Sequence, residues 1–170
     1  LLPIAPDYVN ITDDRWVIVV NEKCADLPPP PPICDANLEL VANGSLENGV
    51  DAGVFNTLNG GDNTSITNWT VDFGSVDYIG SYWQPSDGAR SIDLNGTVTG
   101  SISQTIPTNI GDTYTVTFDL SGNPQGSENP DFISPSLKDV LVNATGATST
   151  NYTYDTAVEG NSLADMKWKQ

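Results

Sequence analysis

The chain has 170 residues and carries 22 acidic against 6 basic side chains, a formal net charge of −16 at pH 7. Charge of this sign repels phosphate backbones and anionic membrane surfaces, so it argues against nucleic acids as partners and favours cations, calcium above all. A high like charge also keeps an exported protein in solution, and the charge alone does not choose between these roles.

The length accommodates one well-buried domain with a short appendage. Asn, Thr, Ser, Gly and Asp are abundant, and residues of these types favour strands and turns, which predicts an all-β fold. No run of about 20 apolar residues is present, so we expect no membrane insertion. The chain opens on Leu1 without a basic leader, which is typical of a mature secreted protein, extracellular or attached to a cell surface.

Residues 1–23 are predicted to form an extended N-terminal arm. The arm contains one continuously apolar, β-branched run, typical of a buried strand: Trp16, Val17, Ile18, Val19 and Val20. Residues 24–34 form a proline-rich spacer, and residues 35–170 form the remaining domain.

Cys24 and Cys34 bound the spacer, and in an exported protein a disulfide is the expected state. The five prolines at 28–32 extend about 15 Å in polyproline II conformation. Bridged Cα atoms must lie within about 7 Å, so the intervening residues have to turn the chain back sharply. A bridge to another chain is the alternative.

Within the domain, short strands are predicted at intervals of about 8–15 residues with Gly, Pro and Asn between them, which indicates a β-sandwich. The clearest alternation runs over residues 113–120, where apolar and polar side chains take opposite faces. The other strands are expected at 38–42, 69–73, 76–79, 91–94, 101–106, 139–143 and 151–155, and no helix is predicted.

Several ordered motifs carry a resemblance to a known family. The sequence NGSLENG at residues 43–49 resembles the opening of many galactose-binding-like jelly rolls, and TNWTV at 67–71 resembles the strand that follows it. Four further motifs follow, SVDYIGSYWQ at 75–84, DGARSIDLNG at 87–96, GSISQT at 100–105 and TYTVTFDLSGNP at 113–124. Taken together, the motifs make the chain similar to the bacterial choice-of-anchor C family, which is related to plant cell-wall proteins. The resemblance runs from about residue 37 to Trp168. It implies a galactose-binding-like jelly-roll β-sandwich at a cell surface or in extracellular matrix, linked with polysaccharide and without enzymatic activity.

The similar proteins continue beyond the segment that resembles residues 165–168 with two or three further strands, whereas this chain stops at Gln170. Missing strands would expose apolar faces and unpaired edges. Either the sequence is a fragment, or the arm strand at residues 16–20 fills the gap. It can do so in its own chain, or in a neighbour by donor-strand exchange, which would make identical subunits polymerise into a filament.

We expect no catalysis. Histidine is absent, which removes a Ser-His-Asp triad and histidine-based acid–base or metal sites. Carbohydrate binding is favoured instead, because sugars stack on aromatic rings and hydrogen bond to carboxylates, amides and arginine. One loop-like stretch supplies all of these, in Tyr78, Tyr82, Trp83, Gln84, Asp87 and Arg90. The alternative is that Tyr78 and Trp83 pack in the core and Arg90 pairs with a carboxylate.

No cofactor is required, but the resemblance implies a structural calcium ion held by oxygen ligands of the first loop and a late strand. Glu47 lies in the matching motif, with Asp51 or Asp62 as further ligands, or Glu47 is an ordinary loop acid. Seven Asn-x-Ser/Thr sequons mark candidate glycosylation sites at Asn10, Asn43, Asn63, Asn68, Asn95, Asn143 and Asn151.

Overall fold

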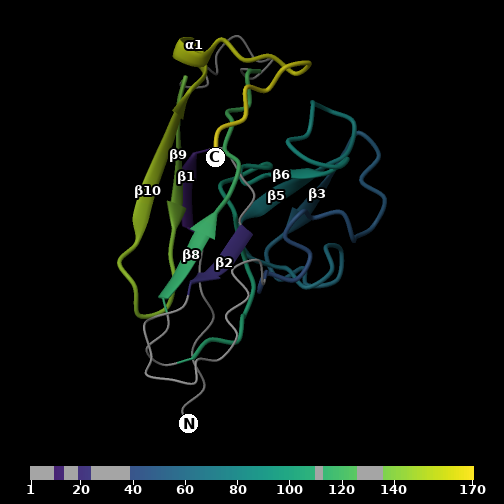
Figure 1. Ribbon diagram of the computed structural model, residues 1–170. Coiled ribbons are helices and arrows are strands. Elements are labelled where there is room, and N and C mark those ends of the chain that lie inside the picture. The colour runs from purple at the N-terminus through teal and green to yellow at the C-terminus, as the bar shows by residue number, and fades with distance from the viewer. Residues whose placement is uncertain (1–9, 14–18, 24–38, 110–112, 126–135) are drawn as a thin grey trace.

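The computed structural model describes residues 10–13, 19–23, 39–109, 113–125 and 136–170 (Figure 1). Over these ranges the chain forms short strands and a single short helix. In chain order they are β1 (Asn10–Asp13), β2 (Val19–Lys23), β3 (Phe55–Asn59), β4 (Thr70–Phe73), β5 (Ser75–Ile79), β6 (Ser91–Asp93), β7 (Ser101–Ser103), β8 (Thr113–Thr117), β9 (Leu137–Val142), β10 (Thr150–Asp155) and α1 (Thr156–Glu159). None of the helical segments in these ranges has the length and apolar character needed to cross a lipid bilayer.

All strand pairs are antiparallel and belong to four small sheets, ordered β1-β9-β10, β2-β8, β3-β5-β6 and β4-β7. Figure 1 shows β9 and β10 on one side of the molecule and β3, β5 and β6 on the other, with β8 and β2 between the two groups. The all-β class predicted from composition is therefore confirmed.

One continuous apolar core joins both sides. Val76, Tyr78 and Ile92 from β5 and β6 pack in the same buried cluster as Val140 of β9 and Tyr154 of β10. Strands from opposite sides of the molecule thus share one interior, which is the arrangement of a β-sandwich.

Most of the predicted strands are present. The predicted segments at 69–73, 76–79, 91–94 and 151–155 correspond to β4, β5, β6 and β10, each within a residue or two of its predicted bounds. The strands predicted at 101–106 and 113–120 are shorter, since β7 and β8 end at Ser103 and Thr117. Residues 39–42, the described part of the segment predicted at 38–42, contain no strand, and residue 39 makes only an isolated bridge. β1, β3 and the single turn of α1 were not predicted. Leu58 is the one buried residue of β3, so this strand depends on its pairing with β5 rather than on an apolar pattern.

The predicted arm strand forms within its own chain. Val19 and Val20 begin β2, which continues to Lys23 and pairs with β8 from Val19 opposite Thr117 to Lys23 opposite Thr113. Trp16, Val17 and Ile18, together with Cys24, Cys34 and the prolines between them, lie outside the described residues.

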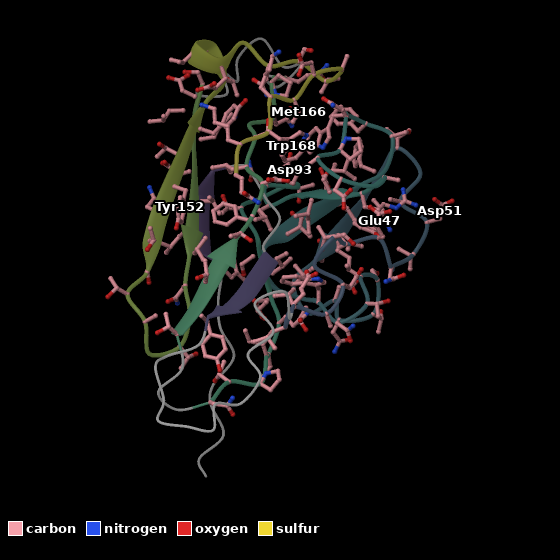
Figure 2. All side chains as sticks on the ribbon, in the orientation of Figure 1. Glu47, Asp51, Asp93, Tyr152, Met166 and Trp168 are labelled. Atoms are coloured by element: carbon pink, nitrogen blue, oxygen red, sulfur yellow. The ribbon has the colours of Figure 1, made fainter. Side chains whose placement is uncertain are left out.

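The C-terminal segment packs against the strands. Leu120 and Lys169 exchange backbone hydrogen bonds of 2.7 and 2.9 Å. Met166 is fully buried in a second apolar cluster with Ile79 and Trp83. Figure 2 shows Met166 and Trp168 between the two groups of strands. Residues 161–170 therefore pack against the apolar interior of the described structure.

Candidate functional site

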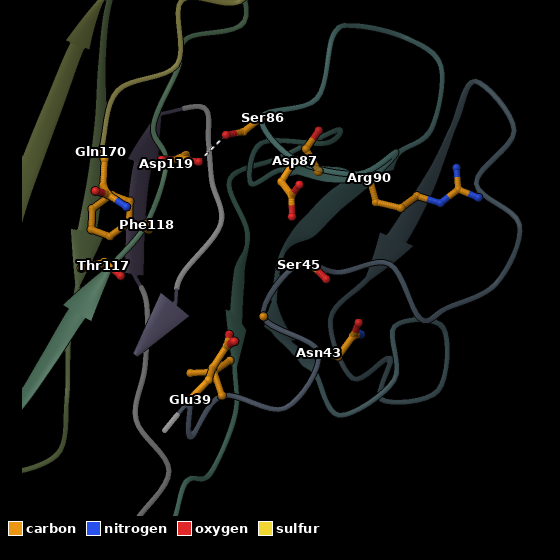
Figure 3. Close-up of a pocket in the computed structure, with 13 residues that line it drawn as sticks. Glu39, Asn43, Ser45, Ser86, Asp87, Arg90, Thr117, Phe118, Asp119 and Gln170 are labelled. Atoms are coloured by element: carbon orange, nitrogen blue, oxygen red, sulfur yellow. Dashed lines mark hydrogen bonds between the residues drawn. The ribbon is translucent and has the colours of Figure 1, made fainter. Parts of the chain in front are cut away.

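A polar groove of about 540 Å³ opens on the surface where four separate segments meet (Figure 3). Its walls come from the segment before Leu46, the loop that precedes β6, the residues that end and follow β8, and the C-terminal residue. The lining residues are Glu39, Val41, Asn43, Gly44, Ser45, Ser86, Asp87, Arg90, Ser91, Thr117, Phe118, Asp119 and Gln170. Hydroxyls, amides and carboxylates dominate, with the Phe118 ring as the aromatic member.

Hydrogen bonds between distant segments fix the walls of the groove. Ser86 Oγ donates to Asp119 Oδ2, which ties the loop before β6 to the segment after β8. On the other side, Glu47 Oε1 accepts the backbone N–H groups of Ala89 at 2.9 Å and Arg90 at 2.8 Å. Gly88 adopts a φ of +57°, and a Cβ at this position would lie 2.4 Å from Glu47 Oε1. Glu47 therefore acts as the anchor of the loop that carries Asp87.

The three acids predicted as calcium ligands do not gather. Glu47 is engaged by the loop, and Asp51 lies 3.9 Å from Arg90 with a side chain that is 92% exposed. Asp62 accepts from the backbone of Thr64 and from the backbone and hydroxyl of Ser65. Burial raises the pKa of Asp62, but these hydrogen bonds outweigh it and hold the value below the usual range. Across the described ranges, no three Asp, Glu, Cys or His side chains form a group that would hold a metal ion.

Two of the predicted sugar-stacking residues need correction, because they are core residues. Tyr78 is fully buried and its hydroxyl donates to the carbonyl of Leu46 at 2.6 Å. Trp83 is 4% exposed and its indole N–H donates to Ser91 Oγ at 2.7 Å. Burial raises the pKa of the Tyr78 hydroxyl, with partial compensation by the nearby Arg90 charge. Neither ring offers a face to a ligand.

Gln84 holds the C-terminal segment rather than a ligand. Its backbone N–H donates to Leu163 O at 2.8 Å, its side-chain Oε1 accepts from Met166 N at 3.1 Å, and its carbonyl accepts from the Trp168 indole at 3.0 Å. Gln84 therefore has a structural role, and it is not among the residues that line the groove.

Tyr82 lies away from the groove. Its ring contacts Phe55 edge to face, with centroids 5.4 Å apart, and its hydroxyl donates to Gln125 at 2.8 Å. Asp87 and Arg90, by contrast, both line the groove. Figure 3 shows the Arg90 side chain extending away from Asp87, and the guanidinium lies over the Tyr78 ring at 5.7 Å.

Sequence reasoning did not assign the groove residues that come from other segments, among them Glu39, Asp119 and Gln170. Asp119 is one of the polar positions of the alternating segment 113–120, and that position was a usable signal for a surface acid. Nothing in the sequence pattern places Glu39 or Gln170 beside it, because the approach of these segments is set by tertiary packing.

The sequons differ in accessibility. Asn63, Asn68 and Asn151 are exposed, whereas Asn43, Asn95 and Asn143 are partly buried. Asn10 begins β1. Both hydrogens of the Asn43 amide are engaged, since Nδ2 donates to Asn48 O at 2.9 Å and to Thr67 O at 2.8 Å.

In folded protein secreted from a glycosylating host, we expect Asn63 to carry a glycan and Asn43 to be unmodified. An N-glycan would replace one of the two hydrogens that Asn43 donates, and the loop would lose that bond. Glycopeptide mass spectrometry of the folded fraction measures occupancy at each site. An occupied Asn43 in folded protein would contradict the loop geometry.

A comparison with known proteins shows which family the chain resembles. Residues 39–168 match the family described as Protein of unknown function (DUF642). Halomucin from Haloquadratum walsbyi (strain DSM 16790 / HBSQ001) is 44% identical over 88 residues, which cover 49% of this chain and 1% of halomucin. The chain thus spans a very small part of that relative. No solved structure matches the chain significantly. Because the family match covers the strands from β3 to β10 and every groove residue except Gln170, the chain belongs to the DUF642 family.

Proposed function

We propose that this chain is a secreted, non-catalytic β-sandwich module of a cell surface or extracellular matrix that binds carbohydrate in the groove. The groove itself supports the proposal. It brings hydroxyl, amide and carboxylate groups from four segments around a volume of about 540 Å³. Such convergent polar groups are the usual means of orienting a sugar by its hydroxyls.

Further support comes from the likeness to known proteins. The motifs at residues 43–49 and 75–96 resemble the choice-of-anchor C family and, through it, the galactose-binding-like jelly roll. Halomucin is by its name a mucin, which is compatible with a location outside the cell. The non-catalytic assignment is supported by the absence of histidine from the sequence.

The rival function, a subunit that polymerises by donor-strand exchange, has less support. β2 pairs along its whole length with β8 of its own chain, so a neighbour's strand would have to displace it. A calcium ion at Glu47 is not part of the proposal, because that carboxylate is engaged by two backbone N–H groups.

Blocking the groove tests the proposal. A panel of neutral, acidic and amino-sugar oligosaccharides is screened first, and the strongest binder is measured by calorimetry. We expect Ser45→Trp, which places a large ring in the groove, to weaken binding at least about tenfold, or about 1.4 kcal/mol. The matched control is Ser149→Trp, on the exposed turn between β9 and β10.

Thermal unfolding confirms that both variants are folded before binding is compared. If no oligosaccharide binds, or if Ser45→Trp binds as tightly as the control, the proposed function is wrong.

A further inference from the structure

We infer that the groove selects glycans carrying free, protonated amino groups over neutral or uronic-acid glycans. This inference rests on the proposed function and deepens it by naming the ligand class. It follows from the distribution of charge around the groove rather than from its shape.

Three carboxylates face the same volume from three different segments. Glu39 precedes the first loop, Asp87 lies on the loop before β6, and Asp119 follows β8. In the view of Figure 3, Asp87 lies to the right of Asp119 and above Ser45. Asp119 accepts from Ser86, a neutral hydroxyl, so this contact leaves its negative charge uncompensated.

Arg90 is the sole cation among the described lining residues, and its charge is directed elsewhere. Its guanidinium lies over the Tyr78 ring and 3.9 Å from Asp51, and Figure 3 shows it extending away from Asp87. Lys167 and Lys169 pair with Asp165 and Glu159 on the C-terminal side. The groove therefore presents an excess of negative charge on a chain whose net charge is already −16.

The groove carboxylates suit an amine ligand better than a metal ion. A bound divalent ion needs several oxygens around one point, and the described residues provide no such group of three acids. Carboxylates on three different segments of one groove suit the several ammonium groups of an oligosaccharide, each of which forms a charge-assisted hydrogen bond. Uronic acids meet like charge there, and neutral sugars gain no charge-assisted bond.

The test compares trimers of β-1,4-linked glucosamine and of its N-acetylated form, which share one backbone and differ in charge, with a galacturonic acid trimer. We expect the free amine to bind at least about tenfold more tightly than the acetylated form at low salt, since one charge-assisted bond is worth this much. Raising the salt to about 1 M should shrink that preference by screening.

Variants locate the preference within the groove. We expect Asp87→Asn and Asp119→Asn each to reduce the preference for the amine about threefold to tenfold. Asp165→Asn removes the same charge from an exposed position outside the groove and should leave the preference unchanged. This control separates groove recognition from general attraction to an acidic protein.

The outcomes are distinct. If the acetylated or uronic-acid trimer binds as well as the free amine, or if Asp165→Asn lowers the preference as much as Asp87→Asn, the inference is overturned while the proposed function stands. If no trimer binds but another glycan binds in a manner blocked by Ser45→Trp, the inference is likewise overturned. If no glycan binds at all, both the inference and the proposed function are wrong.

Discussion

Replacing Asn43 with alanine should destabilise the domain by about 3 kcal/mol, because three hydrogen bonds worth about 1 kcal/mol each are lost. The side chain donates to Asn48 O and Thr67 O and accepts from Asn48 N at 2.9 Å. The backbone of Asn43 also has a φ of +57°, which alanine tolerates less well than asparagine. At about 2–4 °C per kcal/mol, calorimetry should show a midpoint lowered by roughly 10 °C.

Two further variants separate the causes of that loss. Asn43→Gly keeps the left-handed backbone favourable, so it should lose only the part of the stability that comes from the three side-chain hydrogen bonds. Asn63→Ala changes an exposed asparagine in the same region and should stay within about 0.5 kcal/mol of the parent. Equal stability of Asn43→Ala and Asn63→Ala would show that the Asn43 bonds do not hold the loop.

Met166→Ala should cost about 3 kcal/mol in the free energy of unfolding, within the range for a buried methionine truncated in a packed core. Met166 is fully buried against Ile79 and Trp83, where the C-terminal segment packs on the strands. Denaturant unfolding measures the effect as a lower midpoint at an unchanged slope.

Val158→Ala is the matched control, since Val158 is 76% exposed on α1 and should be neutral within about 0.5 kcal/mol. A Met166→Ala variant as stable as this control would mean that residues 161–170 do not cover the core in solution.

The strands with a clear alternating pattern could be read from the sequence, and those held by tertiary pairing could not. Val71 and Tyr78 lie in strands whose apolar positions recur with a period of two, and both side chains are buried as that pattern predicts. β3 has Asn at two of its five positions, and its strand conformation follows from pairing with β5. The role of residues 161–170 was likewise hidden, because an isolated bridge and a buried methionine leave no periodic signal.

The candidate site was predicted in part. Asp87 and Arg90 were identified from the loop composition, and both line the groove. Tyr78 and Trp83 failed as ligand contacts because an aromatic residue near a turn has the same appearance in sequence whether it packs inward or outward. Glu47 was recognised as important through the resemblance, but its observed partners are the backbone of Ala89 and Arg90.

The central claim, that the groove is the carbohydrate-binding site, is tested most directly by nuclear magnetic resonance. Uniformly ¹⁵N-labelled chain is titrated with the tightest-binding oligosaccharide of the panel, and backbone amide shifts are followed. The account predicts shifts centred on Gly44, Ser45, Asp119 and Gln170. Shifts centred instead on Phe55 and Tyr82, the aromatic pair outside the groove, would contradict it.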